Sequence, residues 1–310
     1  MKLLAILGAL ATALAVQYFV LIRPWYQTWG ATSAEMQATL PGDALAPDAA
    51  EVETRAITID ASPGQVWPWL AQLGQGRAGF YSYRFLQNLL GMEMPDGDRL
   101  LGLPDPRPGD RLLMSPRPSM GGRAYATYEE VLPGRALVLR TYSLHALGRD
   151  GAAPPSGSWA FVLRAESAGK TRLLVRSRTG SEYAAPSVAG LALGTLAIDP
   201  IHFMFERKLM LGVKERAEGR APAPAWVEAL EVVLWLVTAL LGLSAAAAAL
   251  LRRTNALRPL AAATAAAFVL TLLFFARPPL AVAVVAVALL RWAVSWAWKK
   301  PREAERTVVA

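Results

Sequence analysis

The stretch Gly74–Gly79 reads GQGRAG and matches G-x-G-x-x-G, the spacing with which a glycine-rich loop holds the phosphates of a dinucleotide. That chemistry needs a strand before the glycines and a helix that begins at them, so that the phosphate meets the helix N-terminus. Here a predicted helix precedes Gly74, and the candidate ribose acids Asp96 and Asp98 lie in a loop rich in proline and glycine. We therefore interpret the stretch as a helix C-cap followed by a turn.

The histidines are the other residues that could transfer protons or bind a metal, and the chain has two, His145 and His202. His202 and Glu206 are four residues apart and would share one face of a helix. A metal site needs a third ligand, and no HExxH or similar pattern is present, so we predict neither a metal nor a cofactor. We interpret His202 as an interfacial histidine beside a solvated glutamate, with acid–base catalysis as the alternative.

The strongest sign of a binding site is a group of aromatic residues: Trp67, Trp69, Phe80, Tyr81, Tyr83 and Trp159. Core packing explains the group equally well. If it lines a pocket, we expect Arg77 and one of the tyrosines to hold the polar end of a hydrophobic ligand, with Trp67 or Trp69 packed behind them. The alternative is that Arg77 pairs with an acid or a backbone carbonyl and only stabilises the turn.

The residues between these motifs predict strands followed by a long helix. Residues 54–60 alternate as a strand does, and Ser62-Pro63 then starts a helix that ends at Gly74, with a second short helix over 82–90. Further strands are predicted at 111–114, 124–131, 136–144, 158–164 and 171–178. We expect an antiparallel sheet with one solvated face, which would carry Arg172, Arg176 and Arg178.

A final amphipathic helix is predicted at 201–218. Its apolar stripe consists of Ile201, Met204, Phe205, Leu209 and Val213. Methionine and phenylalanine suit adaptable apolar sites, so we predict that this face, and Met204 and Phe205 in particular, forms one wall of an apolar cavity.

The composition indicates a membrane protein, because 54% of the residues are hydrophobic and only 18% are charged. Residues 3–22 form an apolar run long enough to span a bilayer, which we interpret as a retained anchor rather than a cleaved signal peptide. Three more runs, at 229–251, 260–276 and 280–298, approach the same length. There is no cysteine, which excludes disulfides, thiolate nucleophiles and iron–sulfur clusters.

The net charge of +8 comes largely from Lys and Arg next to the apolar runs, so it indicates a bilayer as partner and not a nucleic acid. The clusters at 252–258 and 299–302 can both be cytoplasmic only if the number of spans is even. We therefore expect the polar domain to be extracytoplasmic, with both termini inside. The expected divisions are an anchor at 1–23, an acidic linker at 24–53, a domain at 54–218, a linker at 219–228, a three-span bundle at 229–298 and a charged tail at 299–310.

Several short motifs resemble a known superfamily: WGAT at 29–32, LPGD at 40–43, TRAITIDA at 54–61, VWPWL at 66–70, GQGR at 74–77, FYSY at 80–83 and LGVKERAE at 211–218. With the order of elements, they resemble the START-related helix-grip superfamily of polyketide cyclases and lipid-transfer proteins, in a bacterial membrane-anchored branch. The match covers about residues 25–218. It departs at Arg84, where relatives usually carry an acid, and in one strand, which would fall at 98–103 or be absent.

The resemblance implies an α+β helix-grip fold, in which an antiparallel sheet wraps a long C-terminal helix, here with one N-terminal and three C-terminal transmembrane helices. It also implies a membrane-anchored domain that binds a hydrophobic small molecule or lipid. Two alternatives stay open. One is a cyclase or aromatase-type enzyme that uses the same cavity, with Arg77, Tyr81 or His202 as acid–base groups. The other is a structural or regulatory membrane protein without a functional cavity.

Overall fold

The computed structural model describes residues 8, 12, 15–116, 125–142, 155–167, 169–180, 190, 194–221, 224–251 and 257–298. His145, most of the apolar run before residue 15 and the tail at 299–310 lie outside the described residues. The chain divides into two compact units, Met1–Pro222 and Ala223–Ala310.

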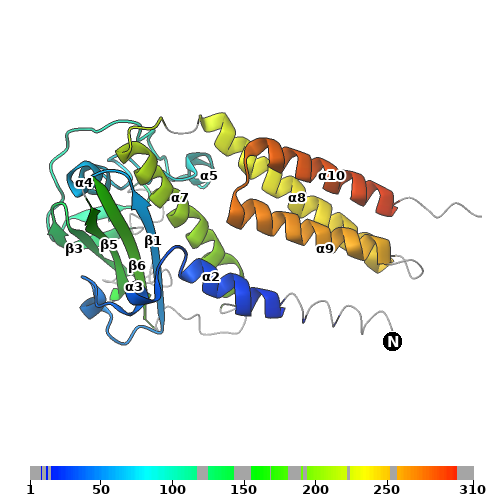
Figure 1. Ribbon diagram of the computed structural model, residues 1–310, viewed down its shortest axis with the longest axis horizontal. Helices are drawn as coiled ribbons and strands as arrows, with labels where there is room; N and C mark the ends of the chain where they lie inside the picture. The colour runs from blue at the N-terminus through cyan, green and yellow to red at the C-terminus, as the bar shows by residue number, and fades with distance from the viewer. Residues whose placement is uncertain are drawn as a thin grey trace, which may run out of the picture. The chain divides into compact units, whose positions relative to one another are not determined.

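The first unit is α+β and is built on an antiparallel sheet of six strands in the order β1-β6-β5-β4-β3-β2 (Figure 1). The strands are β1 (Glu51–Ile59), β2 (Arg111–Leu113), β3 (Tyr125–Leu132), β4 (Ala136–Tyr142), β5 (Pro155–Ser167) and β6 (Lys170–Thr179). Each overlaps a strand that the alternation of apolar and polar residues predicted. Residues 98–103 form no strand.

Short helices and one long helix complete this unit. They are η1 (Gln17–Ile22), α2 (Arg23–Gln27), α3 (Ser33–Gln37), η2 (Asp43–Leu45), α4 (Pro63–Ala71), α5 (Arg84–Leu89), η6 (Gly194–Ile198) and α7 (Asp199–Ala217). The start of α4 is set by Pro63 in its first turn and by a capping box between Ser62 and Gln65. The predicted turn after α4 is confirmed: Gly74 and Gly79 exchange two backbone hydrogen bonds of 3.0 Å, and both have positive φ.

The main core lies between the sheet and the two helices α4 and α7. The inward strand residues include Leu137, Leu139, Trp159, Phe161, Leu163, Leu173 and Val175. Helix α7 contributes Leu209, Met210 and Val213. Of the predicted stripe, Ile201 is 46% exposed, because the face that α7 buries is centred on Glu206, Leu209 and Val213. In the second half of α7, the residues predicted to line a cavity, Leu209 and Val213, are instead packed in the core.

The outer face of the sheet is covered by residues 31–47, called the strap below, which fall within the predicted acidic linker. Its Leu40 packs into a small second cluster with outward residues of the sheet: Ala56, Ala136, Val138, Ala160, Val162 and Leu174. Arg176 on β6 donates hydrogen bonds to the strap carbonyls of Ala38 (2.7 Å), Glu35 (2.8 Å) and Met36 (2.9 Å).

The expectation of a solvated arginine face was therefore wrong. Arg176 is only 2% exposed, and it also pairs with Asp43 at 2.8 Å. Arg172 forms hydrogen bonds with both carboxylate oxygens of Glu35, at 2.7 and 2.9 Å. Residues 24–53 were predicted to be a linker because they are acidic, but two of these acids, Glu35 and Asp43, are the counter-ions of arginines on the sheet. Arg172 and Thr32 lower the pKa of Glu35 to about 2, against the opposing effect of burial.

The second unit consists of α8 (Ala225–Leu251), α9 (Leu257–Thr271), η7 (Leu272–Ala276) and α10 (Leu280–Trp298). Three of its helices, at 225–251, 257–274 and 280–298, are long and apolar enough to cross a membrane. Small residues line part of their contact, including Ala245, Ala262, Ala266 and Ala297. At residues 277–279 the chain turns between η7 and α10. Arg277 forms hydrogen bonds with both oxygens of Glu231, at 3.1 and 3.0 Å, beside a hollow of about 20 Å³.

Candidate functional site

Arg77 and Tyr81, the predicted polar anchors, both bond to the protein itself. Arg77 donates to the carbonyl of Pro104 at 2.7 Å. The Tyr81 hydroxyl donates to the carbonyl of Trp69 at 3.0 Å and accepts from the Gln72 side chain at 2.8 Å. Burial raises the pKa of Tyr81, against weaker opposing effects of Gln72 and nearby arginines. This arrangement fits the alternative in which these side chains stabilise the turn, and their role in ligand binding stays a prediction.

The other aromatic residues near the turn point to separate neighbours. Trp67 is buried and donates its indole N–H to Asp105 at 3.0 Å. Trp69 is half-buried and lies edge-on to Tyr81, with ring centres 6.0 Å apart. Tyr83 is buried against Phe205 of α7, with ring centres 6.2 Å apart. Arg77 thus bonds to the loop at Pro104, whereas both tyrosines contact α7, Tyr81 through Arg216 and Tyr83 through Phe205.

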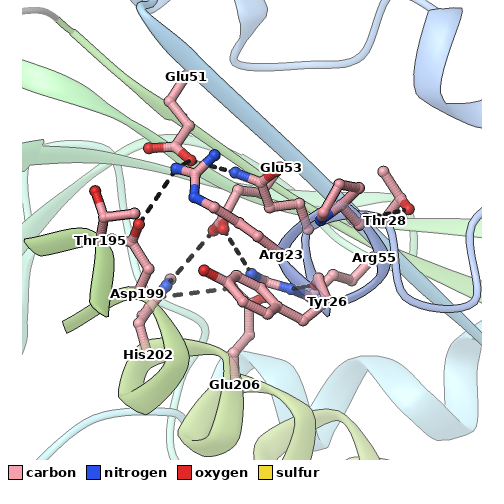
Figure 2. A network of polar contacts seen from close by, with 12 residues as sticks. Arg23, Tyr26, Thr28, Glu51, Glu53, Arg55, Thr195, Asp199, His202 and Glu206 are labelled. Atoms are coloured by element: carbon pink, nitrogen blue, oxygen red, sulfur yellow. Dashed lines mark hydrogen bonds and ion pairs between the residues drawn. The ribbon is translucent and has the colours of Figure 1, made fainter. Parts of the chain in front are cut away.

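Trp159 and Met204 lie toward the start of α7. Met204 is 9% exposed. The ring of Trp159 packs against Phe161, with ring centres 4.7 Å apart. Its indole N–H donates to Glu206 at 2.7 Å. Through this hydrogen bond, the predicted site residue Trp159 belongs to a buried polar network that joins α2, β1 and α7 (Figure 2).

Arg55 on β1 is at the centre of this network and is fully buried. Its guanidinium lies 2.8 Å from Glu53 Oε1 and pairs with Glu206 on α7, and its Nε donates to the carbonyl of Tyr26 at 2.8 Å. A buried guanidinium is tolerated only when its charge is balanced by nearby carboxylates in this way. Burial would raise the pKa of Glu53, but Arg55 and His202 outweigh it, and the pKa lies below its usual range.

His202 lies where the network meets the surface, and its side chain is 45% exposed. Its Nδ1 is 3.7 Å from Glu53 and its Nε2 is 4.0 Å from Glu206. Burial opposes the charged imidazole, but the two carboxylates outweigh that effect and raise the pKa of His202. The expectation of a solvated glutamate was wrong, because Glu206 is 2% exposed and bonded to Arg55 and Trp159.

A second group of charges joins the N-terminal helix to the same place. Arg23 pairs with Glu51 of β1 and, at 3.3 Å, with Asp199 of α7. The hydroxyls of Tyr18 and Tyr26 are 3.0 Å apart. Burial is the main cause that raises the pKa of both Glu51 and Asp199, and Arg23 only partly opposes it.

Sequence reasoning missed most of this network. Glu51 and Glu53 were assigned to a linker, and Arg23 to a membrane flank. One signal was available: on β1, Glu53 and Arg55 share the face of Ile57 and Ile59, which pack in the core. Two opposite charges on the inward face of a strand indicate a buried ion pair. Within the described residues, no group of three or more His, Asp or Glu could hold a metal ion.

The fold and this site define an α+β protein with an antiparallel sheet and a long helix, followed by three apolar helices. A comparison with protein-family models gives no match, and neither does one with curated proteins. Solved structures similar to about half of the chain include CalC, a self-sacrificing resistance protein from Micromonospora echinospora, with 13% identity, 54% of this chain and 94% of that chain covered, and a TM-score of 0.34.

Two further similar structures carry related printed names. An AHSA1-like protein from Rhizobium etli is 19% identical, with 56% of this chain and 86% of that chain covered and a TM-score of 0.27. Aha1 from Colwellia psychrerythraea is 12% identical, with 54% of this chain and 96% of that chain covered and a TM-score of 0.26. These similarities are weak, and no functional conclusion is drawn from them.

Proposed function

We propose that this is a membrane-embedded protein whose α+β unit binds a hydrophobic small molecule or lipid at the start of α7. The observation that carries the proposal is His202, a half-exposed imidazole held by a buried network, with exposed apolar side chains close to it along the helix. Ile201 beside it is 46% exposed, and Ile198 one helical turn before it is 39% exposed. Trp25, which packs on the neighbouring Phe203, is 39% exposed. A polar group among exposed apolar ones suits a ligand that is mostly apolar and has one hydrogen-bonding end.

The network limits the chemistry of that polar end. Glu53, Arg55 and Glu206 already bond to one another or to the protein, so His202 is the group that can still meet a ligand. The carboxylates around it outnumber the guanidinium of Arg55. A strongly anionic head group would therefore be repelled whenever the imidazole is neutral. We favour a neutral hydroxyl or carbonyl compound, bound by the imidazole and covered by Ile198 and Ile201.

Native mass spectrometry of the detergent-purified protein tests this proposal. We expect the wild-type chain to carry a co-purified lipid or other hydrophobic molecule, and His202→Gln to carry much less. Lys170→Gln, at a side chain that is 54% exposed on β6, is the matched control and should carry as much as wild type. Equal occupancy in His202→Gln would place the ligand elsewhere, and no bound molecule in any variant would reject the proposal.

Acid–base catalysis on the bound molecule is a second candidate, and the arrangement around His202 favours it. The imidazole lies between two carboxylates that raise its pKa, as in sites where a carboxylate orients a catalytic histidine. If catalysis occurs, the molecule bound to His202→Gln should differ in mass from that bound to wild type. If the molecules bound to wild type and to His202→Gln have the same mass, catalysis by His202 is rejected and ligand binding remains the proposed function.

We also propose that the α+β unit faces away from the cytoplasm, with both termini inside. The support is the charge distribution around the apolar helices. The chain has no cysteine, so Asp48→Cys on the exposed side of the unit gives a single reactive thiol. A membrane-impermeant maleimide should label it in intact cells. Labelling only after the cytoplasm is opened would reverse the orientation.

A further inference from the structure

Two helical segments that are far apart in the sequence lie side by side at one end of the first unit. The Tyr18 hydroxyl of η1 donates to the carbonyl of Thr195 in η6. Arg23 of α2 pairs with Asp199 of α7 at 3.3 Å, and Trp25 lies edge-on to Phe203 with ring centres 5.6 Å apart. These contacts place η1–α2 alongside η6–α7.

The outer side of this pair of segments is apolar and exposed. On η1–α2 the exposed side chains include Phe19 (51%), Val20 (62%) and Leu21 (65%), and on η6–α7 they include Leu196 (56%), Ile198 (39%) and Ile201 (46%). We call these six residues the apolar face. A water-exposed surface with so many large apolar side chains is unusual in soluble proteins.

The charged side chains of both segments have charged partners in the buried network. Between residues 194 and 205 the titratable residues are Asp199 and His202, and between 17 and 27 the charged residue is Arg23. Asp199 and Arg23 pair with each other, and His202 faces Glu53 and Glu206 (Figure 2). The two segments thus have their charges paired and bury Tyr26, Phe203 and Met204, yet they also expose the six large apolar side chains of the apolar face. A helix that packs on a core in water carries polar side chains on its exposed side instead.

We infer that the lipid acyl chains of the bilayer cover the apolar face, so that the start of α7 is inserted in the membrane beside the N-terminal helix. Three observations favour lipid over other partners. The apolar sequence of residues 3–22, which ends with η1, is long enough to span. Arg23, Trp25 and Tyr26 follow it, as basic and aromatic residues do at a membrane interface. The second unit contains three helices apolar enough to cross a membrane.

The proposed function does not require α7 to contact the membrane, and the hydropathy of α7 does not indicate such a contact. Insertion of α7 would affect how a ligand reaches the site. The exposed side of His202 would lie at the level of the lipid interface, so a hydrophobic molecule could reach it from the bilayer without passing through water. The insertion itself is testable whether or not any ligand binds.

Spin labels on the cysteine-free chain in liposomes test the inference. Leu196→Cys and Ile198→Cys are the informative positions, since Phe19→Cys would meet lipid in any chain with an N-terminal span. Asp48→Cys, directly after the strap, is the water-exposed control. We expect collisions with dissolved oxygen to exceed those with the water-soluble nickel complex NiEDDA at Leu196 and Ile198, and the reverse at Asp48.

Each other outcome overturns the inference. Greater exposure to NiEDDA at Leu196 and Ile198 would put the start of α7 in water, even if Phe19 met lipid. Protection from both reagents, with line broadening between labels, would show that a second copy of the chain covers the face. Because all these positions are exposed, the labelled variants should melt at the wild-type temperature, which a thermal scan checks.

Discussion

Arg55 on β1 and Glu206 on α7 form an ion pair in which both side chains are almost completely shielded from solvent, although they are 151 residues apart in the chain. The pair connects the first strand of the sheet to the long helix that packs across it. It also connects the core to His202, which lies one helical turn before Glu206. The position of α7 on the sheet and the polarity of the candidate site therefore depend on the same contact.

Replacing Arg55 with Met should strongly destabilise the first unit. The substitution leaves Glu53 and Glu206 buried without their cation, and breaking a buried pair in this way costs about 3–5 kcal/mol. Thermal unfolding followed by circular dichroism measures the loss. The control is Lys170→Met, which removes an exposed pair with Asp60 and should leave the melting temperature unchanged. Equal melting of both variants would show that the Arg55 pair contributes little.

Gly212→Ala should also destabilise this unit. A Cβ at Gly212 would lie 2.4 Å from the carbonyl oxygen and 2.6 Å from the Cβ of Tyr81. Backbone contacts of that length force α7 and the turn before α5 apart, for a loss of about 1–3 kcal/mol. Gly64→Ala is the matched control in α4, where a Cβ meets nothing within 4 Å. It should stabilise by about 0.5–1 kcal/mol. A neutral Gly212→Ala would contradict the close packing.

Stability should fall as the pH rises through the range above about 6.5, the ordinary pKa of histidine. The pKa of His202 is raised in the folded chain, so its protonated form stabilises the fold below the unfolded pKa, and this contribution is lost as the pH passes the folded pKa. Since the side chain is nearly half exposed, screening limits the contribution to about 0.5–1 kcal/mol.

The difference between wild type and His202→Gln isolates this effect from Glu51, Glu53, Asp199 and Glu206 nearby. Melting temperatures measured from pH 6 to pH 9 should converge as the pH rises. A constant difference between wild type and His202→Gln across the range would show that the imidazole is not coupled to the carboxylates.

Arg176→Met should release the strap from the sheet. The guanidinium forms five hydrogen bonds, with Thr54, Ala38, Asp43, Glu35 and Met36. Hydrogen bonds to a charged group contribute about 1.5–3 kcal/mol each when they are removed singly. We expect limited proteolysis to cut within 31–47 in this variant but not in wild type. Arg164→Met, at an exposed arginine of β5, is the control. An uncut strap in Arg176→Met would mean that Leu40 and its apolar neighbours suffice to hold it.

Much of the fold was predictable from local patterns. Alternation located every strand of the sheet, and hydropathy located the apolar helices of the second unit. The glycines at 74, 76 and 79 predicted a turn, because their positive φ values are accessible to glycine without strain. These features depend on residues within one or two turns of each other, so the sequence contains the information directly.

The candidate site could not be predicted in the same way, because its residues come from segments that are distant in the sequence. Alternation on β6 showed that Arg176 is opposite the core, yet only the folded chain places the strap over it. Taken one at a time from the sequence, each charged residue looks ordinary: Glu53 is an acid of the linker, Arg55 a strand residue and Glu206 an acid on the surface. Their pairing arises because the antiparallel sheet and α7 bring them together inside the protein. Local sequence thus determined the elements and their faces, whereas tertiary packing decided which faces are buried and which charges meet, because burial and pairing depend on segments over a hundred residues away.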